Sequence, residues 1–182
     1  MRVIAGTARG IALKTPEGLQ TRPTADRVKE AVFSIIHFDL PGAKVLDLFG
    51  GTGQLGIEAL SRGAKACVFV DESRNACNLI RENLKRTKFT DCGKVTQGEY
   101  QDYLQRCTSK FDIIFLDPPY AEKFLENSLN LITEIDILES GGIIIAERPA
   151  GKELNCEFDG FSRSKDYKYG KTLITLYRKI AL

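Results

Sequence analysis

The sequence has few of the residues that metal sites, disulfide frameworks and catalytic triads need. It contains five cysteines, an odd number without any C-x-x-C pair, which argues against a disulfide framework and against a zinc site. The only histidine, His37, stands near the end of a helical pattern, and nothing near it in the sequence suggests a triad. We therefore expect no bound metal, and a packing or capping role for His37.

Long hydrophobic runs are also missing. The longest apolar runs have the length of a strand, too short to span a bilayer, so we expect no membrane segment. The first ten residues, MRVIAGTARG, lack the apolar stretch of a secretory signal, and we expect a cytoplasmic protein. The chain has 182 residues, 43% hydrophobic and 27% charged, which suits one globular domain. We expect a single domain over residues 1–182, with a small hairpin extension over 1–23 and the core over 24–182.

The net charge of +2 is unevenly distributed along the chain. Residues 1–30 carry six basic and three acidic side chains, and residues 148–182 carry eight and four, whereas the middle carries twelve and seventeen. If both basic ends fold onto one face, they form a surface for nucleic acid, because phosphate neutralisation dominates nucleic-acid affinity. Two solvated termini would explain the same charges, so charge alone leaves both interpretations open.

Helix and strand patterns alternate along most of the chain. Apolar residues at helical spacing predict a first helix over residues 24–37, with Thr24 as its N-cap. From residue 44 on, apolar runs such as KVLDLF, ACVFVD, FDIIFLD and GGIIIAE alternate with amphipathic segments such as SRNACNLIRENLKRT. This pattern predicts an α/β, Rossmann-like fold with a mostly parallel sheet covered on both faces. FSRSKDYKYG and KTLITLYRK have no helix between them, which predicts an antiparallel C-terminal pair.

A glycine-rich loop follows the first predicted strand. In VLDLFGGTGQLG, Gly51, Gly53 and Gly56 spell G-x-G-x-x-G, which lets the backbone approach a ligand and aims a helix N-terminus at it. Asp47 stands four residues before Gly51, where a carboxylate suits a ligand with an ammonium group better than it suits a pyrophosphate. Charge complementarity therefore favours S-adenosylmethionine (SAM) as the cofactor. A NAD-dependent dehydrogenase with the same glycines remains the alternative.

Two more strand ends carry candidate cofactor ligands. Asp71 ends the second strand, where an acid accepts hydrogen bonds from ribose hydroxyls in either cofactor family. Glu99 follows the third strand as a possible acceptor for an adenine amino group, with Tyr100 as a neighbour of the ring. The structural alternatives are a helix N-terminal acid for Glu99 and a packing residue for Tyr100. These positions indicate a nucleoside without separating the two cofactors.

The fourth strand ends in DPPY, residues 117–120. The exocyclic amino group of a base is a poor nucleophile because its lone pair is delocalised into the ring. The Asp117 carboxylate and the Pro118 carbonyl can accept hydrogen bonds from such an amine, while Pro118 and Pro119 keep the loop rigid. Tyr120 offers a face on which a flipped base can stack. A plain turn is the alternative. Position favours a site, because four acids follow consecutive strands: Asp47, Asp71, Glu99 and Asp117.

These segments together resemble the RsmD family of bacterial ribosomal RNA guanine-N2 methyltransferases, which belong to the Rossmann-like, SAM-dependent class. The similar segments follow the family's order over nearly the whole length: MRVIAGTARGIAL, RPTADRVKEAVFSII, VLDLFGGTGQLGIEALSRGA, LDPPY and YGKTLITLYRK. Three positions depart from the usual pattern. Gly50 stands where the family commonly has alanine, Asp71 where it often has glutamate, and Glu99 where it often has aspartate.

The resemblance implies roles for the candidate residues. By that resemblance, the methionine portion of SAM binds at Asp47, Gly51 and Gly53, the ribose at Asp71 and the adenine region at Glu99. The target guanine binds at Asp117, Pro118 and Tyr120. The implied substrate is a guanine amino group in small-subunit (16S) ribosomal RNA, presented on an assembling subunit. The implied RNA phosphate contacts are Arg2, Arg9, Arg22 and Arg27, most of them in the N-terminal extension.

Two further functions compete with this one. A DNA methyltransferase acting on adenine or cytosine amino groups uses the same D-P-P-Y chemistry, although little chain is left here for a target-recognition domain. A non-catalytic RNA-binding assembly factor that keeps the fold would explain the basic ends. The sequence indicates neither the nucleotide that is modified nor the oligomeric state.

Overall fold

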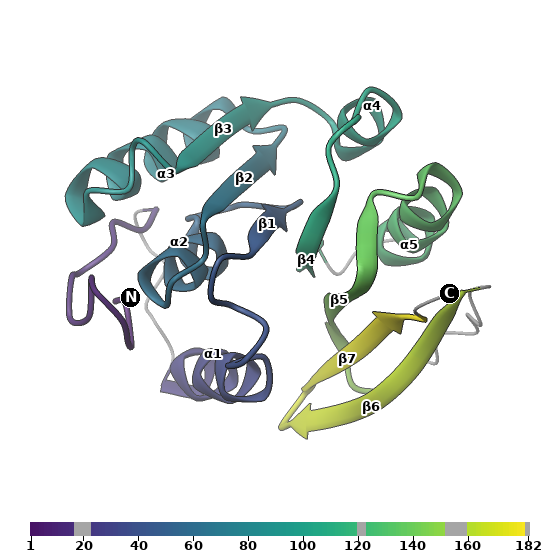
Figure 1. Cartoon of the computed structure of the whole chain (residues 1–182). Helices are drawn as coiled ribbons and strands as arrows, with labels where there is room; N and C mark the ends of the chain where they lie inside the picture. Colours follow the sequence, from purple (N-terminus) through teal and green to yellow (C-terminus); the bar gives the residue numbers. More distant parts are fainter. Residues whose placement is uncertain (17–22, 120–122, 152–159, 181–182) are drawn as a thin grey trace.

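The computed structural model describes residues 1–16, 23–119, 123–151 and 160–180, and its centre is one mixed β-sheet (Figure 1). Within these residues the sheet has seven strands in the order β3-β2-β1-β4-β5-β7-β6. Strands β1 to β5 run parallel to one another, whereas β7 is antiparallel to both β5 and β6. The strand bounds are β1 Lys44–Asp47, β2 Ala66–Asp71, β3 Gly93–Gln97, β4 Phe111–Leu116, β5 Leu138–Pro149, β6 Phe161–Tyr169 and β7 Thr172–Lys179.

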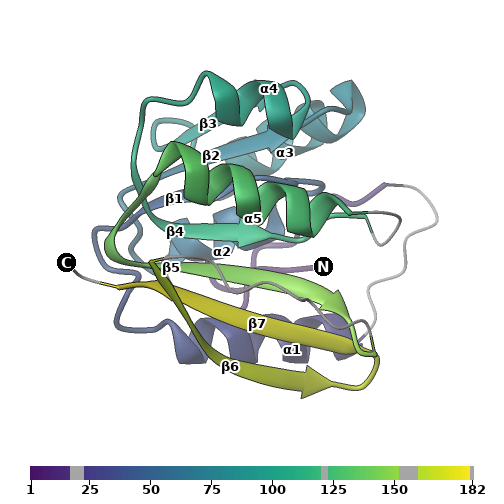
Figure 2. The ribbon, with the colours of Figure 1, turned by 90° about the vertical axis from the view of Figure 1, so that its right-hand side faces the viewer.

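Helices cover both faces of the sheet (Figures 1 and 2). Those named α1, α2 and α3 pack on alternate strand residues that include Val45, Phe69 and Phe115. The other two, α4 and α5, pack on the opposite set, which includes Leu46 and Ile114. Because successive strand side chains point to opposite faces, the core has two layers. The helix bounds are α1 Pro23–Ile35, α2 Gln54–Ser61, α3 Arg74–Thr87, α4 Tyr100–Gln105 and α5 Phe124–Ile135.

The predicted parallel sheet with an antiparallel C-terminal pair is confirmed by this topology. The predicted N-cap is wrong, because α1 begins at Pro23 and Thr24 lies within its first turn. Proline suits the first helical position, where the N–H has no intrahelical partner.

Strand β5 extends beyond the predicted segment GGIIIAE, to Pro149, because its second half pairs with β7. Among the helices of the described residues, none is both long and apolar enough to cross a bilayer.

The predicted N-terminal hairpin is present, although residues 1–16 contain no regular strand. Arg2 and Ala12 form an antiparallel bridge, the Val3 amide donates to the Ile11 carbonyl at 3.0 Å, and the Leu13 amide donates to the Met1 carbonyl at 3.0 Å.

A buried carboxylate of α2 also holds this N-terminal segment. Glu58 accepts hydrogen bonds from the amides of Ile4 at 2.8 Å and Ala5 at 3.0 Å. The buried Lys29 of α1 lies 3.4 Å from Glu58 and donates a hydrogen bond to the Arg2 carbonyl. The Glu58 carboxylate and the Lys29 ammonium group therefore form a buried ion pair. Removing either side chain would leave an unpaired buried charge and strongly destabilise the fold.

A buried amide ties the same segment to the loop after β1. The Asn83 side chain, on α3, accepts a hydrogen bond from the Lys14 amide at 2.7 Å. It also donates to the carbonyl oxygens of Lys14 at 3.0 Å and Thr52 at 2.9 Å. Residues 1–16 therefore lie beside the glycine loop, which contains Thr52.

Candidate active site

The predicted acids of β1, β2 and β4 meet at one edge of the sheet. Asp47 and Asp71 are the last residues of their strands, and Asp117 directly follows β4. Each of the three lies two residues after a core residue of the face covered by α1, α2 and α3, and side-chain direction alternates along a strand. The three carboxyl groups therefore project toward the same face. Those core residues are Val45, Phe69 and Phe115.

Two of these acids fix the glycine loop. The amide of Gly51 donates to Asp71 at 2.8 Å, and the amide of Gly56 donates to the buried Asp47 at 3.1 Å. Gly51 and Gly53 have φ of +55° and +77°, in the left-handed region that favours glycine. A Cβ on Gly56 would lie 2.2 Å from the Phe69 ring, so this third glycine serves helix–sheet packing.

Asp47 is buried without a cation beside it. The pKa of Asp47 is raised to about 7, mainly by burial; the hydrogen bond from Gly56 opposes the rise, and the charge of Asp71 adds to it. Its relative exposure is 1%, and within the described residues no ion pair includes Asp47. A buried carboxyl group whose ionised form is this disfavoured would be stabilised by a cationic ligand.

Asp117 has an acidic neighbour that sequence reasoning missed. Leu116 of β4 pairs with Ala146 of β5, and Asp117 and Glu147 follow these two residues. The pKa of Asp117 is raised to about 8 by burial, then by Glu147 and by Asp47. The signal for Glu147 was present in the sequence, because GGIIIAE is an apolar strand that ends in an acid, like the strands before Asp47 and Asp71.

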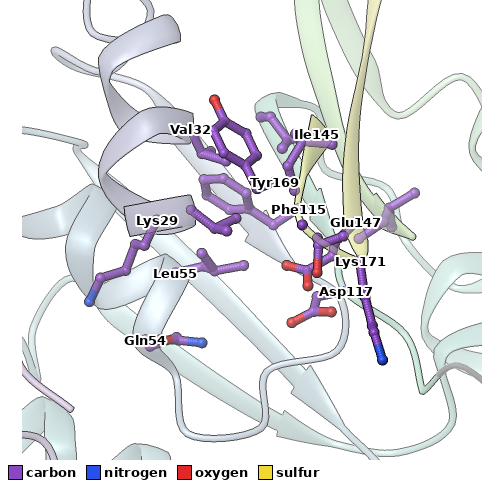
Figure 3. A pocket seen from close by; sticks show the side chains of 15 residues that line it. Lys29, Val32, Gln54, Leu55, Phe115, Asp117, Ile145, Glu147, Tyr169 and Lys171 are labelled. Carbon is purple, nitrogen blue, oxygen red and sulfur yellow. The ribbon is translucent and has the colours of Figure 1, made fainter. Parts of the chain in front are cut away.

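Three cavities meet at Asp117. The glycine-loop cavity, about 220 Å³, is bordered by Asp47, Gly51 and the N-terminal residues Met1, Thr15 and Pro16. The α4 cavity, about 450 Å³, is lined by Phe49, Asp71, Gly98, Tyr100, Pro118 and Phe124, among others. The α1 cavity, also about 450 Å³, lies between α1, α2 and the strands β4, β5 and β7 (Figure 3). Asp117 lines all three, and Glu147 lines both of the larger ones.

The α4 cavity has an aromatic wall. The buried Tyr100 packs against Phe49, with ring centroids 5.3 Å apart, and against Phe124 at 5.8 Å. Glu99 differs from the expectation, because it is exposed at the N-cap of α4 and is not among the residues that line this cavity. The position of Glu99 fits a helix N-terminal acid, and its neighbours Gly98 and Tyr100 form the wall.

Three of the predicted RNA-binding arginines are described, and none of the three lines these cavities. Arg2 and Arg9 stand in the N-terminal segment and Arg27 on α1, and all three side chains are exposed. Arg22 and Tyr120 lie outside the described residues. Of the DPPY loop, the structure describes Asp117, the buried Pro118 and the exposed Pro119.

Comparison with known proteins decides the family. The family model described as "Conserved hypothetical protein 95" matches residues 1–178. The Bacillus subtilis protein YlbH is 40% identical over 182 residues, 98% of this chain and 99% of the relative. Ribosomal RNA small subunit methyltransferase D of Haemophilus influenzae is 34% identical over 157 residues, 85% of this chain and 81% of the relative. The chain belongs to the RsmD family.

A solved structure extends this result to the fold. The structure of the Escherichia coli protein yhhF is 27% identical, has a TM-score of 0.91, and covers 100% of this chain with 99% of its own. The predicted RsmD family and the predicted Rossmann-like methyltransferase fold are both confirmed.

Proposed function

We propose that this RsmD family member transfers the methyl group of SAM to the N2 amino group of a guanine in small-subunit ribosomal RNA. The enzyme class follows from the family, and a relative named ribosomal RNA small subunit methyltransferase D supports the substrate. The observation that carries the proposal is the position of Asp117 and Pro118 where the cavities meet. We further propose that the reaction takes place in the cytoplasm on an assembling small subunit.

The residues on the cofactor side fit SAM. The buried carboxylate of Asp47 suits its ammonium group, beside the backbone of Gly51 and Gly53. Asp71 accepts hydrogen bonds from the amides of Gly51 and Ser73, and the second lone pair on each oxygen can accept one from a ribose hydroxyl. The aromatic wall of the α4 cavity offers Tyr100 to the adenine ring.

In this proposal, Glu99 lies at the entrance to the α4 cavity and not inside it. Its carboxylate is exposed at the N-cap of α4, next to lining residues Gly98 and Tyr100. An exposed carboxylate exchanges hydrogen bonds with water at little net gain. We therefore expect Glu99 to contribute less to SAM affinity than Asp47 does.

On the substrate side, Asp117 and Pro118 orient the guanine amine for methyl transfer. Bound SAM supplies a methyl group on a sulfonium; the amine lone pair forms the new N–C bond, the S–C electron pair stays on sulfur, and the amine loses a proton. The Asp117 carboxylate and the Pro118 carbonyl accept the amine N–H groups and so direct its lone pair. The pKa of Asp117, raised to about 8, makes its ionised form a stronger base for the released proton than an ordinary carboxylate. Pro119 stiffens the loop, and Tyr120 would stack on the base.

We assign the contacts with the phosphate groups of the RNA backbone to the exposed arginines. Arg2 and Arg9 belong to the segment that Glu58 and Asn83 hold beside the glycine loop, so RNA bound there would approach the active site. The exposed Arg27 of α1 is assigned to the same role, and Arg22, outside the described residues, is kept as a proposed phosphate contact. We propose residues 1–23 as an RNA-contacting extension of a catalytic core over residues 24–182 in a single domain.

Transfer of a labelled methyl group tests the proposal. Purified protein and labelled SAM are incubated with small ribosomal subunits from cells that lack the endogenous enzyme, and the RNA is digested to nucleosides. The proposal expects labelled N2-methylguanosine from the parent, none from Asp117→Ala, and undiminished label from the exposed control Asp91→Ala. Labelled duplex DNA with unlabelled subunits would instead identify a DNA methyltransferase. NADH binding without SAM binding would identify a dehydrogenase, and RNA binding without turnover an assembly factor.

A further inference from the structure

The α1 cavity offers both apolar and polar side chains to a ligand. The polar ones include the neighbouring Asp117 and Glu147 and, farther from this pair, Lys29 and Tyr169 (Figure 3). Since Asp117 and Glu147 also line the α4 cavity, they stand between the space assigned to the cofactor and the α1 cavity. A base in the α1 cavity would thus face the methyl donor across these two side chains. The apolar lining includes Val28, Val32, Leu55, Phe115, Ile145 and Ile174.

Glu147 is held rigidly at this boundary. Unlike Asp117, it lies within a strand, and it pairs with Ile174 of β7. Its side chain projects to the same face as Ile145, two residues earlier, which also lines the cavity. Figure 3 shows the carboxyl groups of Asp117 and Glu147 facing the same space. A carboxylate on a strand paired on both sides is preorganised to read one edge of a ligand.

Two adjacent carboxyl groups match the edge of only one of the amino-bearing bases. Beside its N2 amine, guanine carries the N1–H group, so this edge presents hydrogen-bond donors side by side. Beside their amines, adenine and cytosine carry a ring nitrogen with a lone pair, which a carboxylate repels. One carboxyl group can accept a hydrogen bond from the amine, and the other can accept one from the neighbouring ring nitrogen. Only guanine has an N–H group at both positions.

We propose that the α1 cavity receives the target base and that Glu147 selects guanine by accepting a hydrogen bond from its N1–H group while Asp117 and Pro118 hold the N2 amine. This inference rests on the proposed function and names the residue that decides its substrate. It also explains why the same D-P-P-Y loop serves guanine here instead of the amines of adenine or cytosine.

The base 2-aminopurine tests the selected feature. It keeps the amine of guanine but lacks O6 and has a lone pair at N1 in place of the N–H. The loss of O6 is the same for every variant, so a change of preference between variants reports on N1. Once the labelled guanine has been located, small subunits are reconstituted with ribosomal RNA carrying either guanine or 2-aminopurine at that position. The parent and Glu147→Gln are compared on both, and Glu139→Gln, an exposed position on the same strand, is the control.

The expected result is a change of preference as well as a loss of rate. For the parent, kcat/KM should be about 100-fold or more lower on 2-aminopurine than on guanine, because a carboxylate would face a lone pair. Glu147→Gln should lose about 100-fold on guanine and discriminate far less, since its amide N–H can donate to the N1 lone pair. SAM affinity and thermal stability should stay close to those of the parent, and Glu139→Gln should behave as the parent.

Three outcomes are distinguishable failures. If the parent labels guanine but Glu147→Gln keeps both the rate and the preference of the parent, Glu147 does not select the base and the inference is wrong. The same holds if the variant loses activity together with SAM binding or folding, because Glu147 would then be a structural or cofactor residue. If the parent labels no guanine at all, the proposed function itself fails.

Discussion

Asp117 and Glu147 lie side by side, each one residue beyond the Leu116–Ala146 pair that joins β4 to β5. Their proximity raises the pKa of Asp117, which burial has already raised. Two acids placed together repel each other when both are ionised, and this repulsion costs stability. A cationic cofactor or a base edge with N–H groups beside them would offset that cost, as the proposed function expects.

SAM affinity should rise with pH below neutrality. The pKa of Asp47 in the free protein is about 7, and binding of an ammonium group favours its ionised form. At pH 6 most molecules must release a proton to bind, so the affinity should increase about fivefold between pH 6 and 7. Calorimetry in two buffers with different ionisation enthalpies should detect the released proton. Equal enthalpies in both buffers, with an affinity independent of pH, would contradict the assignment of Asp47.

Replacing Asp47 should stabilise the free protein while abolishing SAM binding. Its folded pKa lies above the ordinary value of 3.8, so the folded state binds the proton more tightly than the unfolded chain. That contribution to stability is fully present below pH 4 and is lost as the pH rises toward 7. Asp47→Asn should therefore be more stable than the parent at pH 8, by on the order of 2–4 kcal/mol, and by much less at pH 4.

Urea unfolding of the free protein at both pH values measures the effect of Asp47→Asn. The control is Asp91→Asn, whose side chain is exposed and should change little at either pH. An unchanged or lower stability of Asp47→Asn at pH 8 would show that the carboxylate is not under strain in the folded state.

Asn83 should couple the N-terminal segment to the cofactor site. Asn83→Ala removes the hydrogen bonds to Lys14 and Thr52 and leaves buried backbone groups without partners, a loss of about 1–3 kcal/mol. We expect faster hydrogen exchange in residues 1–16 and weaker SAM binding. Asn75→Ala, at an exposed position of α3, is the control. Protection of residues 1–16 equal to that in the parent would rule out this coupling.

The exposed arginines should act on RNA affinity alone. Replacing Arg2, Arg9 or Arg27 by glutamine should weaken binding of small-subunit RNA and lower the slope of log affinity against log salt by about 1 for each phosphate that an arginine no longer neutralises. SAM affinity should not change. Arg106→Gln, exposed after α4, should leave the slope as it is in the parent. A slope that none of the three variants alters would move the RNA surface elsewhere.

Local patterns allowed the positions of several candidate residues in the fold to be predicted. The alternation of strands and helices indicated the sheet, and the acids after apolar strands marked Asp47, Asp71 and Asp117, because parallel strands end at one edge. Glu147 followed the same pattern and was missed only because its strand was treated as structure. The exposure of Glu99 at the N-cap of α4 was not predicted, since side-chain exposure at a helix start is not visible in a sequence.

The long-range contacts of the N-terminal segment could not be predicted from local sequence patterns. Its predicted hairpin is present, with hydrogen bonds between Val3 and Ile11 and between Met1 and Leu13. Its further hydrogen bonds reach Glu58 and Asn83, which lie more than fifty residues away in the sequence. Hydrophobic periodicity in the sequence does not indicate hydrogen bonds between residues so far apart. A buried polar residue on a helix, such as Asn83 within the apolar face of α3, is the one local sign that a distant backbone must satisfy it.

The identity of the methylated nucleoside is the decisive observation for the proposed reaction. Parent protein and labelled SAM are incubated with unmodified small subunits and duplex DNA in one reaction, and all nucleic acid is digested and separated. We expect a single labelled product, N2-methylguanosine from the RNA, which is lost with Asp117→Ala while the Asp91→Ala control retains it. Label in adenine or cytosine, from either nucleic acid, would contradict the proposed reaction.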